Sequence, residues 1–178
     1  MADTERNFQL LKSVEFLGGL PERELRRMAA ELDTATVSVG TVICRQGDAD
    51  GTFFILKRGK VEVTAKNEQG EVVLRTELKA GEFFGEFSLV TGEPRSATCT
   101  ATEEAELLGI GKPQMKSVLA ANRDFSDFIS GVLAWRQYRL EMRMGSRTAV
   151  QAATPQQQEQ VAEIKGELQK RMGNYFAK

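Results

Sequence analysis

The stretch FFGEFSLVTGEPRSATCTA, residues 83–101, decides how this chain is interpreted. Gly85 has no Cβ, so its backbone can approach a bound ligand closely. Glu86 carries a carboxylate that can accept a hydrogen bond from a hydroxyl group. Phe87 and Ser88 can begin a single helical turn, whose free N–H groups would point at an anion. These features together indicate a binding site.

A cation and a hydroxyl follow at the end of the same stretch. Arg95 has a planar guanidinium whose donors match phosphate oxygens, and Ser96 adds a hydroxyl beside it. A buried phosphate is stable only where it is paired and hydrogen-bonded, and these groups would meet that need. The stretch therefore predicts a pocket for a cyclic sugar phosphate. Two plainer interpretations remain open: Glu86 and Arg95 as a structural ion pair on a loop, and Ser96 as a turn residue.

The composition is that of an ordinary globular protein. The chain has 178 residues, 41% hydrophobic and 28% charged, which suits one domain with appendages. Its 24 basic and 25 acidic residues give a net charge of −1, so no overall field attracts nucleic acid. No apolar run approaches the roughly 20 residues of a membrane span. The charged amino terminus lacks the apolar core of a signal peptide, so we expect a cytoplasmic location and no membrane insertion.

Several residue types that catalysis requires are missing or badly placed. The chain contains no histidine, which argues against a Ser-His-Asp triad or a histidine-rich metal site. The adjacent carboxylates Glu103 and Glu104 read as solvated residues of a turn. We therefore expect neither an enzyme nor a bound metal.

The two cysteines lie in apolar stretches that resemble strands. Cys44 and Cys99 are expected to be buried and reduced, because a free cysteine packs as a small hydrophobic residue. A disulfide or a redox switch is the alternative, and it depends on a separation that the sequence does not provide.

The order of patterns predicts an α+β fold, an antiparallel β jelly roll flanked by N-terminal and C-terminal helices. After a tail over 1–7, helical spacing of apolar residues begins at Phe8 and continues to about Asp33. Short β-rich runs punctuated by glycine fill 34–111, and the stretch NEQG between two of them is a hairpin signal.

Helical patterns return after the predicted roll. A long helix is expected over 123–144, followed by a Gln-rich linker over 145–157. The last segment, 158–178, is expected to form an amphipathic helix that ends near Gly173. Its apolar face is formed by Val161, Ile164, Leu168, Met172 and Phe176.

The quoted stretch closely resembles the phosphate-binding cassette of the cyclic nucleotide-binding domain family. The resemblance covers 8–144 and extends to bacterial domains that regulate cyclic nucleotide-gated and mechanosensitive-type channels. It implies that Glu86 binds the ribose 2′-hydroxyl, Arg95 a phosphate oxygen, and Ser96 the phosphate or the base. The remaining cassette positions that it assigns to the ligand are Gly85, Phe87, Ser88 and Ala97.

The purine needs an apolar wall and a lid. We expect Val72, Leu74 and Phe83 to supply the wall. In similar bacterial channel domains the last helix carries a purine-contacting arginine, which here corresponds to Arg136, with Arg139 as second choice. Both could instead be solvated helix residues. Trp135 is expected to pack in the core.

The resemblance implies a regulatory module that senses a cyclic nucleotide, with cAMP favoured over cGMP, and passes the signal on by moving its C-terminal helix. The protein partner is then an unidentified effector or a channel, and a homo-oligomer is left open. One alternative is a regulatory domain of a bacterial ion channel, excised or free-standing. A catabolite-activator-type transcription regulator is disfavoured, because 145–178 has no room for a basic recognition helix, so no direct nucleic-acid contact is expected.

Overall fold

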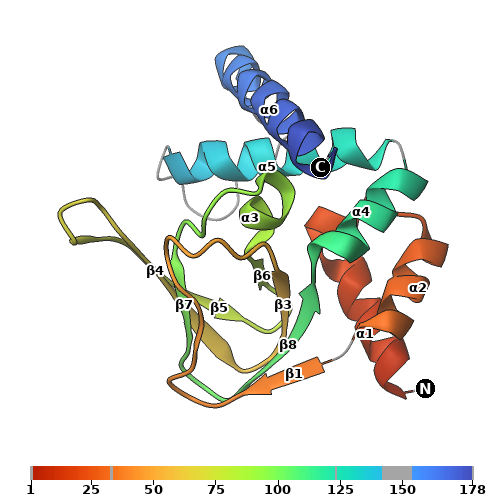
Figure 1. Cartoon of the computed structure of the whole chain (residues 1–178), viewed down its shortest axis with the longest axis vertical. Helices are drawn as coiled ribbons and strands as arrows, with labels where there is room; N and C mark the ends of the chain where they lie inside the picture. Colours follow the sequence, from red (N-terminus) through yellow and green to blue (C-terminus); the bar gives the residue numbers. More distant parts are fainter. Residues whose placement is uncertain (1, 33, 123, 142–153, 178) are drawn as a thin grey trace.

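A computed structural model describes residues 2–32, 34–122, 124–141 and 154–177 (Figure 1). The helices are α1 (Ala2–Ser13), the 3-10 helix η1 (Glu15–Leu17), α2 (Glu22–Glu31), α3 (Glu86–Thr91), α4 (Lys112–Ala121), α5 (Phe125–Glu141) and α6 (Pro155–Phe176). The strands are β1 (Thr34–Val37), β2 (Val42–Cys44), β3 (Phe53–Arg58), β4 (Lys60–Lys66), β5 (Val72–Lys79), β6 (Phe83–Phe84), β7 (Thr98–Ala101) and β8 (Ala105–Ile110).

The eight strands form two antiparallel four-stranded sheets. One has the order β1-β8-β3-β6 and the other the order β2-β7-β4-β5. Strands distant in sequence therefore pair, as in β1 with β8 and β2 with β7. Helices lie on one side of this roll, with α1, α2 and α4 beside it and α5 and α6 across one end (Figure 1). The predicted fold class is confirmed.

The hairpin between β4 and β5 projects from the body of the roll (Figure 1). The expected NEQG turn is present, and Asn67 anchors it by accepting hydrogen bonds from the backbone N–H groups of Gln69 and Glu71. Gly70 closes the turn at φ +83°, a left-handed conformation that glycine adopts without strain.

Two apolar cores hold the layers together. One fills the space between the helices and the sheet that contains β3 and β8, and includes Phe8, Leu11, Ile129 and Leu133. The other lies between the two sheets and includes Leu56, Val61, Phe84 and Leu107. The cassette helix α3 contributes Leu89 and Val90 to the first core, so the helices hold it in place.

The predicted tail over 1–7 is wrong, because α1 begins at Ala2. Asp3 and Glu5 lie in its first turn, where negative charge favours a helix N-terminus. Glu5 also pairs with Arg26 of α2 at 3.2 Å. The polar sequence that resembles a tail is therefore the solvated first turn of a helix whose buried residues start at the polar Asn7 and the apolar Phe8.

The bounds predicted for the last helix also need correction. It begins at Pro155 and not at 158, because Thr154 and Gln157 form a capping box and proline suits the first helical position. It continues past Gly173 to Phe176, because Tyr175 and Phe176 pack against the domain. Of the predicted linker, 145–153 lies outside the described residues.

Candidate functional site

A cavity of about 140 Å³ opens between the inner face of the β2-β7-β4-β5 sheet and the segment that joins β6 to α3. Its walls come from parts of the chain that are distant in sequence. The lining residues are Cys44, Val63, Leu74, Thr76, Leu78, Phe84, Gly85, Glu86, Phe87, Ser88, Arg95, Ser96, Ala97 and Cys99.

Gly85 occupies a position that tolerates only glycine. Its φ is +82°, in the left-handed region, and it is the N-cap of α3. A Cβ built there would overlap the guanidinium of Arg95 and lie 2.7 Å from the carbonyl oxygen of Thr52. The missing side chain therefore lets the arginine lie directly against the backbone where α3 begins.

Among the described side chains, Arg95 is the only cationic one that lines the cavity, and it is 2% exposed. Its backbone is held on both sides, since its N–H donates to the carbonyl of Asp48 and its carbonyl accepts from the N–H of Gly47. Its Nη1 donates to the carbonyl oxygen of Gly85 at 3.2 Å, and its Nη2 lies 2.5 Å from a carboxylate oxygen of Asp50. The Nε atom is buried and has no hydrogen-bond partner among the described residues.

Asp50 is the carboxylate that pairs with Arg95. Its side chain is 52% exposed, and its other oxygen accepts hydrogen bonds from the N–H and the hydroxyl of Thr52. Burial raises the pKa of Asp50, but the hydrogen bonds from Arg95 and Thr52 outweigh it, so its pKa lies below the usual value. Asp50 is therefore anionic at neutral pH and partly neutralises the arginine.

The other polar groups of the cassette differ in depth. Glu86 and Ser88 are buried, at 4% and 3% exposure, whereas Ser96 is exposed. The cavity thus has a carboxylate and a guanidinium inside and a hydroxyl at its edge. That arrangement can bind a small ligand that carries both an anionic group and a hydroxyl.

The predicted cassette residues Gly85, Glu86, Phe87, Ser88, Arg95, Ser96 and Ala97 all line this one cavity. Their roles toward a ligand stay predictions. Leu74, predicted as part of the apolar wall, lines it as well. Glu103 and Glu104 are interpreted from the sequence as solvated residues of a turn. The structure agrees, since both are exposed and pair with basic side chains of the neighbouring strands.

Two predicted wall residues lie elsewhere. The pairing of β4 with β5 shifts register between Ala65 and Lys66, so Val72 lies opposite Lys66 and is 47% exposed. Phe83 packs against Phe53 in the core beneath the helices, with ring centroids 5.5 Å apart. Because neighbouring strand residues face opposite sides of a sheet, Phe84 lines the cavity in its place.

The predicted lid residues are only partly described. Arg136 is within α5 and Arg139 follows it there, but the side chains of both lie outside the described residues. Trp135 is buried at 7% exposure and packs against Tyr138, as expected of a core residue, with ring centroids 5.5 Å apart.

The sequence interpretation missed several lining residues. Val63, Thr76 and Leu78 follow the two-residue period of β4 and β5, and that period could have indicated their common face. Cys44 and Cys99 reach the cavity because β2 pairs with β7. No local signal predicts that pairing.

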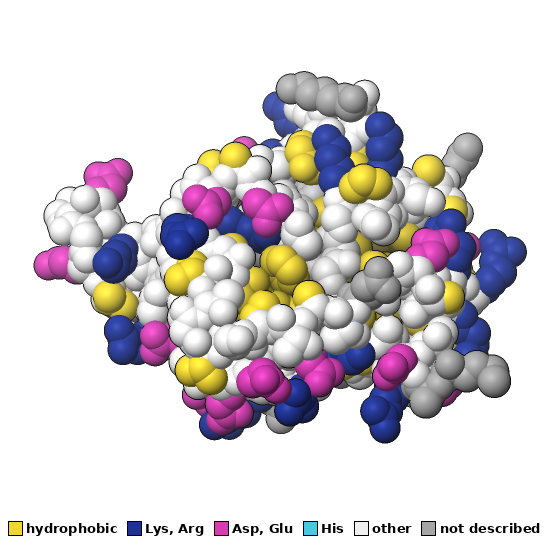
Figure 2. Space-filling model, turned by 60° about the horizontal axis from the view of Figure 1, so that its bottom comes forward, with side chains coloured by type: hydrophobic (Ala, Val, Ile, Leu, Met, Phe, Trp, Pro, Cys, Tyr) yellow, Lys and Arg dark blue, Asp and Glu magenta, His cyan; other side chains and the backbone are white. Residues whose placement is uncertain are grey.

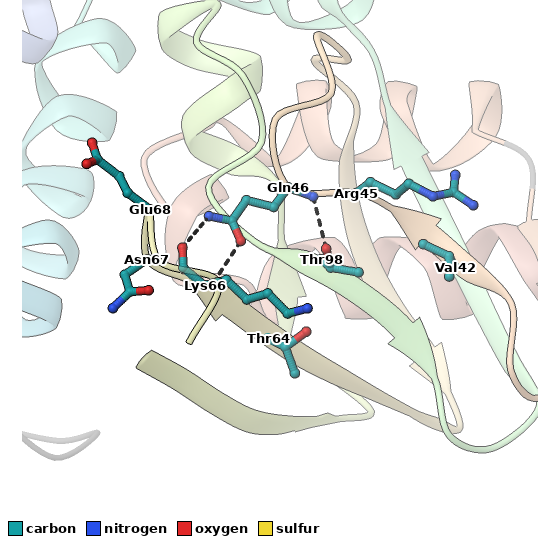
Figure 3. A pocket seen from close by; sticks show the side chains of 9 residues that line it. Val42, Arg45, Gln46, Thr64, Lys66, Asn67, Glu68 and Thr98 are labelled. Carbon is teal, nitrogen blue, oxygen red and sulfur yellow. Dashed lines mark hydrogen bonds between the residues drawn. The ribbon is translucent and has the colours of Figure 1, made fainter. Parts of the chain in front are cut away.

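A larger and more open hollow of about 500 Å³ lies on the outer face of the same sheet (Figure 3). Gln46 spans it by two hydrogen bonds of 2.8 Å to the backbone of Lys66, and its own N–H donates to the hydroxyl of Thr98 at 3.0 Å. Its lining is mostly polar and partly or fully exposed, with Val42 as the apolar exception. The cations among its described lining residues, Arg45 and Lys66, are both exposed, so we place the candidate site in the smaller cavity.

Acidic and basic side chains alternate on the face in Figure 2, around a hollow in which apolar side chains gather.

Among the described residues, no cluster of three or more histidine, cysteine, aspartate or glutamate residues could hold a metal ion. In the same part of the chain, no helix is both long and apolar enough to cross a membrane.

Residues 35–122 match the family model described as "Cyclic nucleotide-binding domain". This part of the chain therefore belongs to the cyclic nucleotide-binding domain family, a family of regulatory domains, as the cassette predicted.

Relatives of known function agree with this assignment. The chain is 35% identical over 109 residues to a cAMP-dependent protein kinase regulatory subunit of Yarrowia lipolytica, covering 61% of this chain and 28% of that protein. It is 32% identical over 143 residues to a cyclic nucleotide-gated potassium channel of Rhizobium etli, covering 80% and 37%. The regulatory domain of Toxoplasma gondii PKA, solved with cAMP, superposes with a TM-score of 0.62 at 26% identity, covering 69% and 48%. The chain thus spans about a third of the length of the two curated relatives.

Proposed function

We propose that this chain is a non-catalytic sensor that binds cAMP in the cavity beside Arg95. One observation carries the proposal: a buried guanidinium lies against the left-handed backbone of Gly85, and one of its nitrogens has no partner in the part of the chain that the structure describes. A buried cation needs anionic acceptors, and Asp50 supplies them only from one side. A cyclic phosphate would supply the remainder.

In this proposal the cassette groups bind different parts of the ligand. The phosphate oxygens face Arg95 and the backbone N–H groups where α3 begins, and Glu86 accepts from the ribose 2′-hydroxyl. The carboxylate must face the sugar, because next to the phosphate it would repel the ligand. Ser88 and Ala97 complete the wall around the sugar phosphate.

The size of the cavity suggests where the base lies. Ligand pockets commonly measure about 300–1,000 Å³, and this one is about 140 Å³. We therefore assign the ribose and phosphate to the cavity and the purine to its open edge, next to Leu74 and the exposed Ser96. The helix α5, through Arg136, is the proposed lid over the base.

Packing of α6 suggests how occupancy is transmitted. The helix contacts both α5 and the cassette helix α3. Its Arg171 pairs with Glu93 at 2.8 Å, just beyond α3, and the ring of Tyr175 lies against Gly92. A nucleotide that shifts α3 would thereby move α6. The nucleotide would favour one of two arrangements of the helices only if it bound that arrangement more tightly than the other. The contact between the nucleotide and the lid helix α5 must therefore differ between the two arrangements.

The output of the sensor is an effector protein or a channel. The names of the relatives, a kinase regulatory subunit and a gated potassium channel, support this class of partner. A domain attached to a channel is the second candidate, supported by the match to the channel over 80% of this chain. The cytoplasmic location stays a prediction from the amino-terminal sequence.

Calorimetric titration with cAMP and cGMP tests the proposal. Arg95→Ala removes charge-assisted hydrogen bonds worth roughly 1.5–3 kcal/mol each, so affinity should fall about 10- to 100-fold or more. Arg45→Ala removes the same side chain from the outer hollow and should bind like the wild type. A melting curve of each variant confirms folding, and Arg95→Lys serves if Arg95→Ala does not fold. Equal binding by wild type and a folded Arg95 variant, or no heat with either nucleotide, would refute the proposal.

The same titration tests the choice of nucleotide and the lid. Wild type should bind cAMP more tightly than cGMP, and the reverse order would contradict the assignment of cAMP. Arg136→Ala should change the ratio of the two affinities more than it weakens both. An unchanged ratio would remove Arg136 from the base contact.

A further inference from the structure

Cys44 of β2 and Cys99 of β7 are direct partners in an antiparallel strand pair. Residues opposite each other in such a pair have Cα atoms about 4.5–5.5 Å apart. A disulfide accepts Cα separations of roughly 4.4–6.8 Å. Both side chains are free thiols on the inner face of the sheet, 6% and 3% exposed. The register shifts between Val42 and Cys44, but Cys44 and Cys99 still lie opposite each other, so the strand pairing is compatible with a disulfide between them.

The two thiols are chemically unequal. The hydrogen bond from Cys99 lowers the pKa of Cys44, burial opposes this, and the positive charge of Arg95 lowers it further, to about 7. The same hydrogen bond, together with burial, raises the pKa of Cys99. The lowered pKa of Cys44 favours its thiolate, the form that reacts with oxidants, while the raised pKa of Cys99 keeps its neighbour protonated.

Both thiols are also at the candidate binding site. Each lines the cavity that Arg95, Ser96 and Ala97 line. The cavity offers a small oxidant a route to both sulfur atoms, and a bound ligand would close that route. This placement separates the pair from cysteines buried in an ordinary core.

We propose that Cys44 and Cys99 form a redox-active dithiol inside the nucleotide cavity, which a hydroperoxide oxidises to a disulfide when the cavity is empty. In the first step the Cys44 thiolate attacks the peroxide oxygen, forming a sulfenic acid and releasing water or an alcohol once the leaving oxygen is protonated. In the second step the Cys99 sulfur displaces the hydroxyl of the sulfenic acid, and the thiol proton leaves with it as water. Two thiols lose two electrons in total, and the peroxide gains them.

Nucleotide and oxidant then compete for the same space, a part of the proposal that rests on the proposed function. A bound phosphate would cover Cys44 and, as a second negative charge next to Arg95, disfavour its thiolate. With nucleotide at 100 times its dissociation constant, about 1% of the protein has an empty cavity, so oxidation should slow about 100-fold. Linkage requires the reverse effect, namely that oxidation changes the affinity for nucleotide.

The test treats the full chain with hydrogen peroxide and follows free thiols and peptide masses over time. These are the only two cysteines in the sequence, so every thiol lost belongs to the pair. Wild type should form an intramolecular disulfide that a reductant reverses. Cys99→Ala should accumulate a sulfenic acid on Cys44 that a cyclic dione traps, whereas Cys44→Ala should react far more slowly. Melting curves establish that both variants fold, and serine replaces alanine in either one that does not.

The outcomes separate the two proposals. An absence of the disulfide in wild type without nucleotide would overturn the dithiol, whatever the calorimetry shows. Disulfide formation that cAMP does not slow, in protein that calorimetry shows to bind cAMP, would overturn the coupling to the cavity. Protection by cAMP that Arg95→Ala abolishes would support both. Disulfide formation in protein that binds neither nucleotide would support the dithiol and refute the proposed function alone.

Discussion

Replacement of Gly85 by alanine isolates the close approach on which the cavity depends. An L-residue in the left-handed region costs about 1–2 kcal/mol. The added Cβ would also overlap the guanidinium of Arg95 and lie 2.7 Å from the carbonyl oxygen of Thr52. The Thr52 contact is to backbone, which cannot rotate away, and forced overpacking costs about 1–3 kcal/mol. Gly85→Ala should therefore lose about 2–5 kcal/mol of folding free energy in total.

Gly81→Ala is the matched control. Gly81 has φ +91°, but a Cβ there would meet nothing within 4 Å. It should lose only the backbone contribution of about 1–2 kcal/mol. In a domain of this size 1 kcal/mol shifts the melting temperature by roughly 2–4 °C, so calorimetry or circular dichroism resolves the two variants. Cyclic AMP binding should stay unchanged in Gly81→Ala and fall at least about tenfold in Gly85→Ala, because Arg95 is displaced.

Two results would refute this reasoning. Equal melting temperatures for the two variants would mean that the overlap with Arg95 and Thr52 is relieved without cost. Unchanged nucleotide affinity in Gly85→Ala would mean that the position of the guanidinium does not control binding.

Two further expectations concern the helix α6 and acid stability. The ring of Tyr175 lies against Gly92, and the Nζ atom of Lys112 is 3.8 Å from the centroid of that ring. Tyr175→Ala removes these contacts, so amide hydrogen exchange in α6 should accelerate, whereas the exposed control Lys170→Ala should leave it unchanged. Equal exchange in the two variants would contradict a role of Tyr175 in docking α6. The lowered pKa of Asp50 stabilises the fold above the unfolded value of about 3.9, and this contribution is lost as pH falls through the folded pKa. Asp50→Asn should therefore lose less stability than wild type between about pH 5 and pH 2 in urea titrations, and parallel profiles would refute the Arg95–Asp50 contribution.

The sequence could predict what is local in the chain. The cassette residues from Gly85 to Ala97 are close in sequence and lie around one cavity, because a short helix and a tight loop are enough to bring them together. The order of helices and glycine-punctuated strands could be predicted as well, since the spacing of apolar residues within each segment indicates whether it is a helix or a strand.

The remainder depends on contacts between distant segments. Asp50 meets Arg95, and Cys44 meets Cys99, only because the roll joins strands that are far apart in the chain. The position of Val72 has a similar cause, since a single register shift in the β4–β5 pair turns its side chain out of the cavity, and its contact with a base stays a prediction. The start of α6 was missed for a different reason: the Gln-rich composition concealed a capping box at Thr154.

The buried position of Trp135 has a practical consequence. It is the only tryptophan of the chain and belongs to α5, the proposed lid. Its indole N–H is buried and has no hydrogen-bond partner among the described residues. Indole emission depends strongly on the polarity around the ring, so a rearrangement of α5 that lets water reach this group would change the colour of the fluorescence. The protein thus carries its own optical probe, placed on one helix and free of background from a second indole.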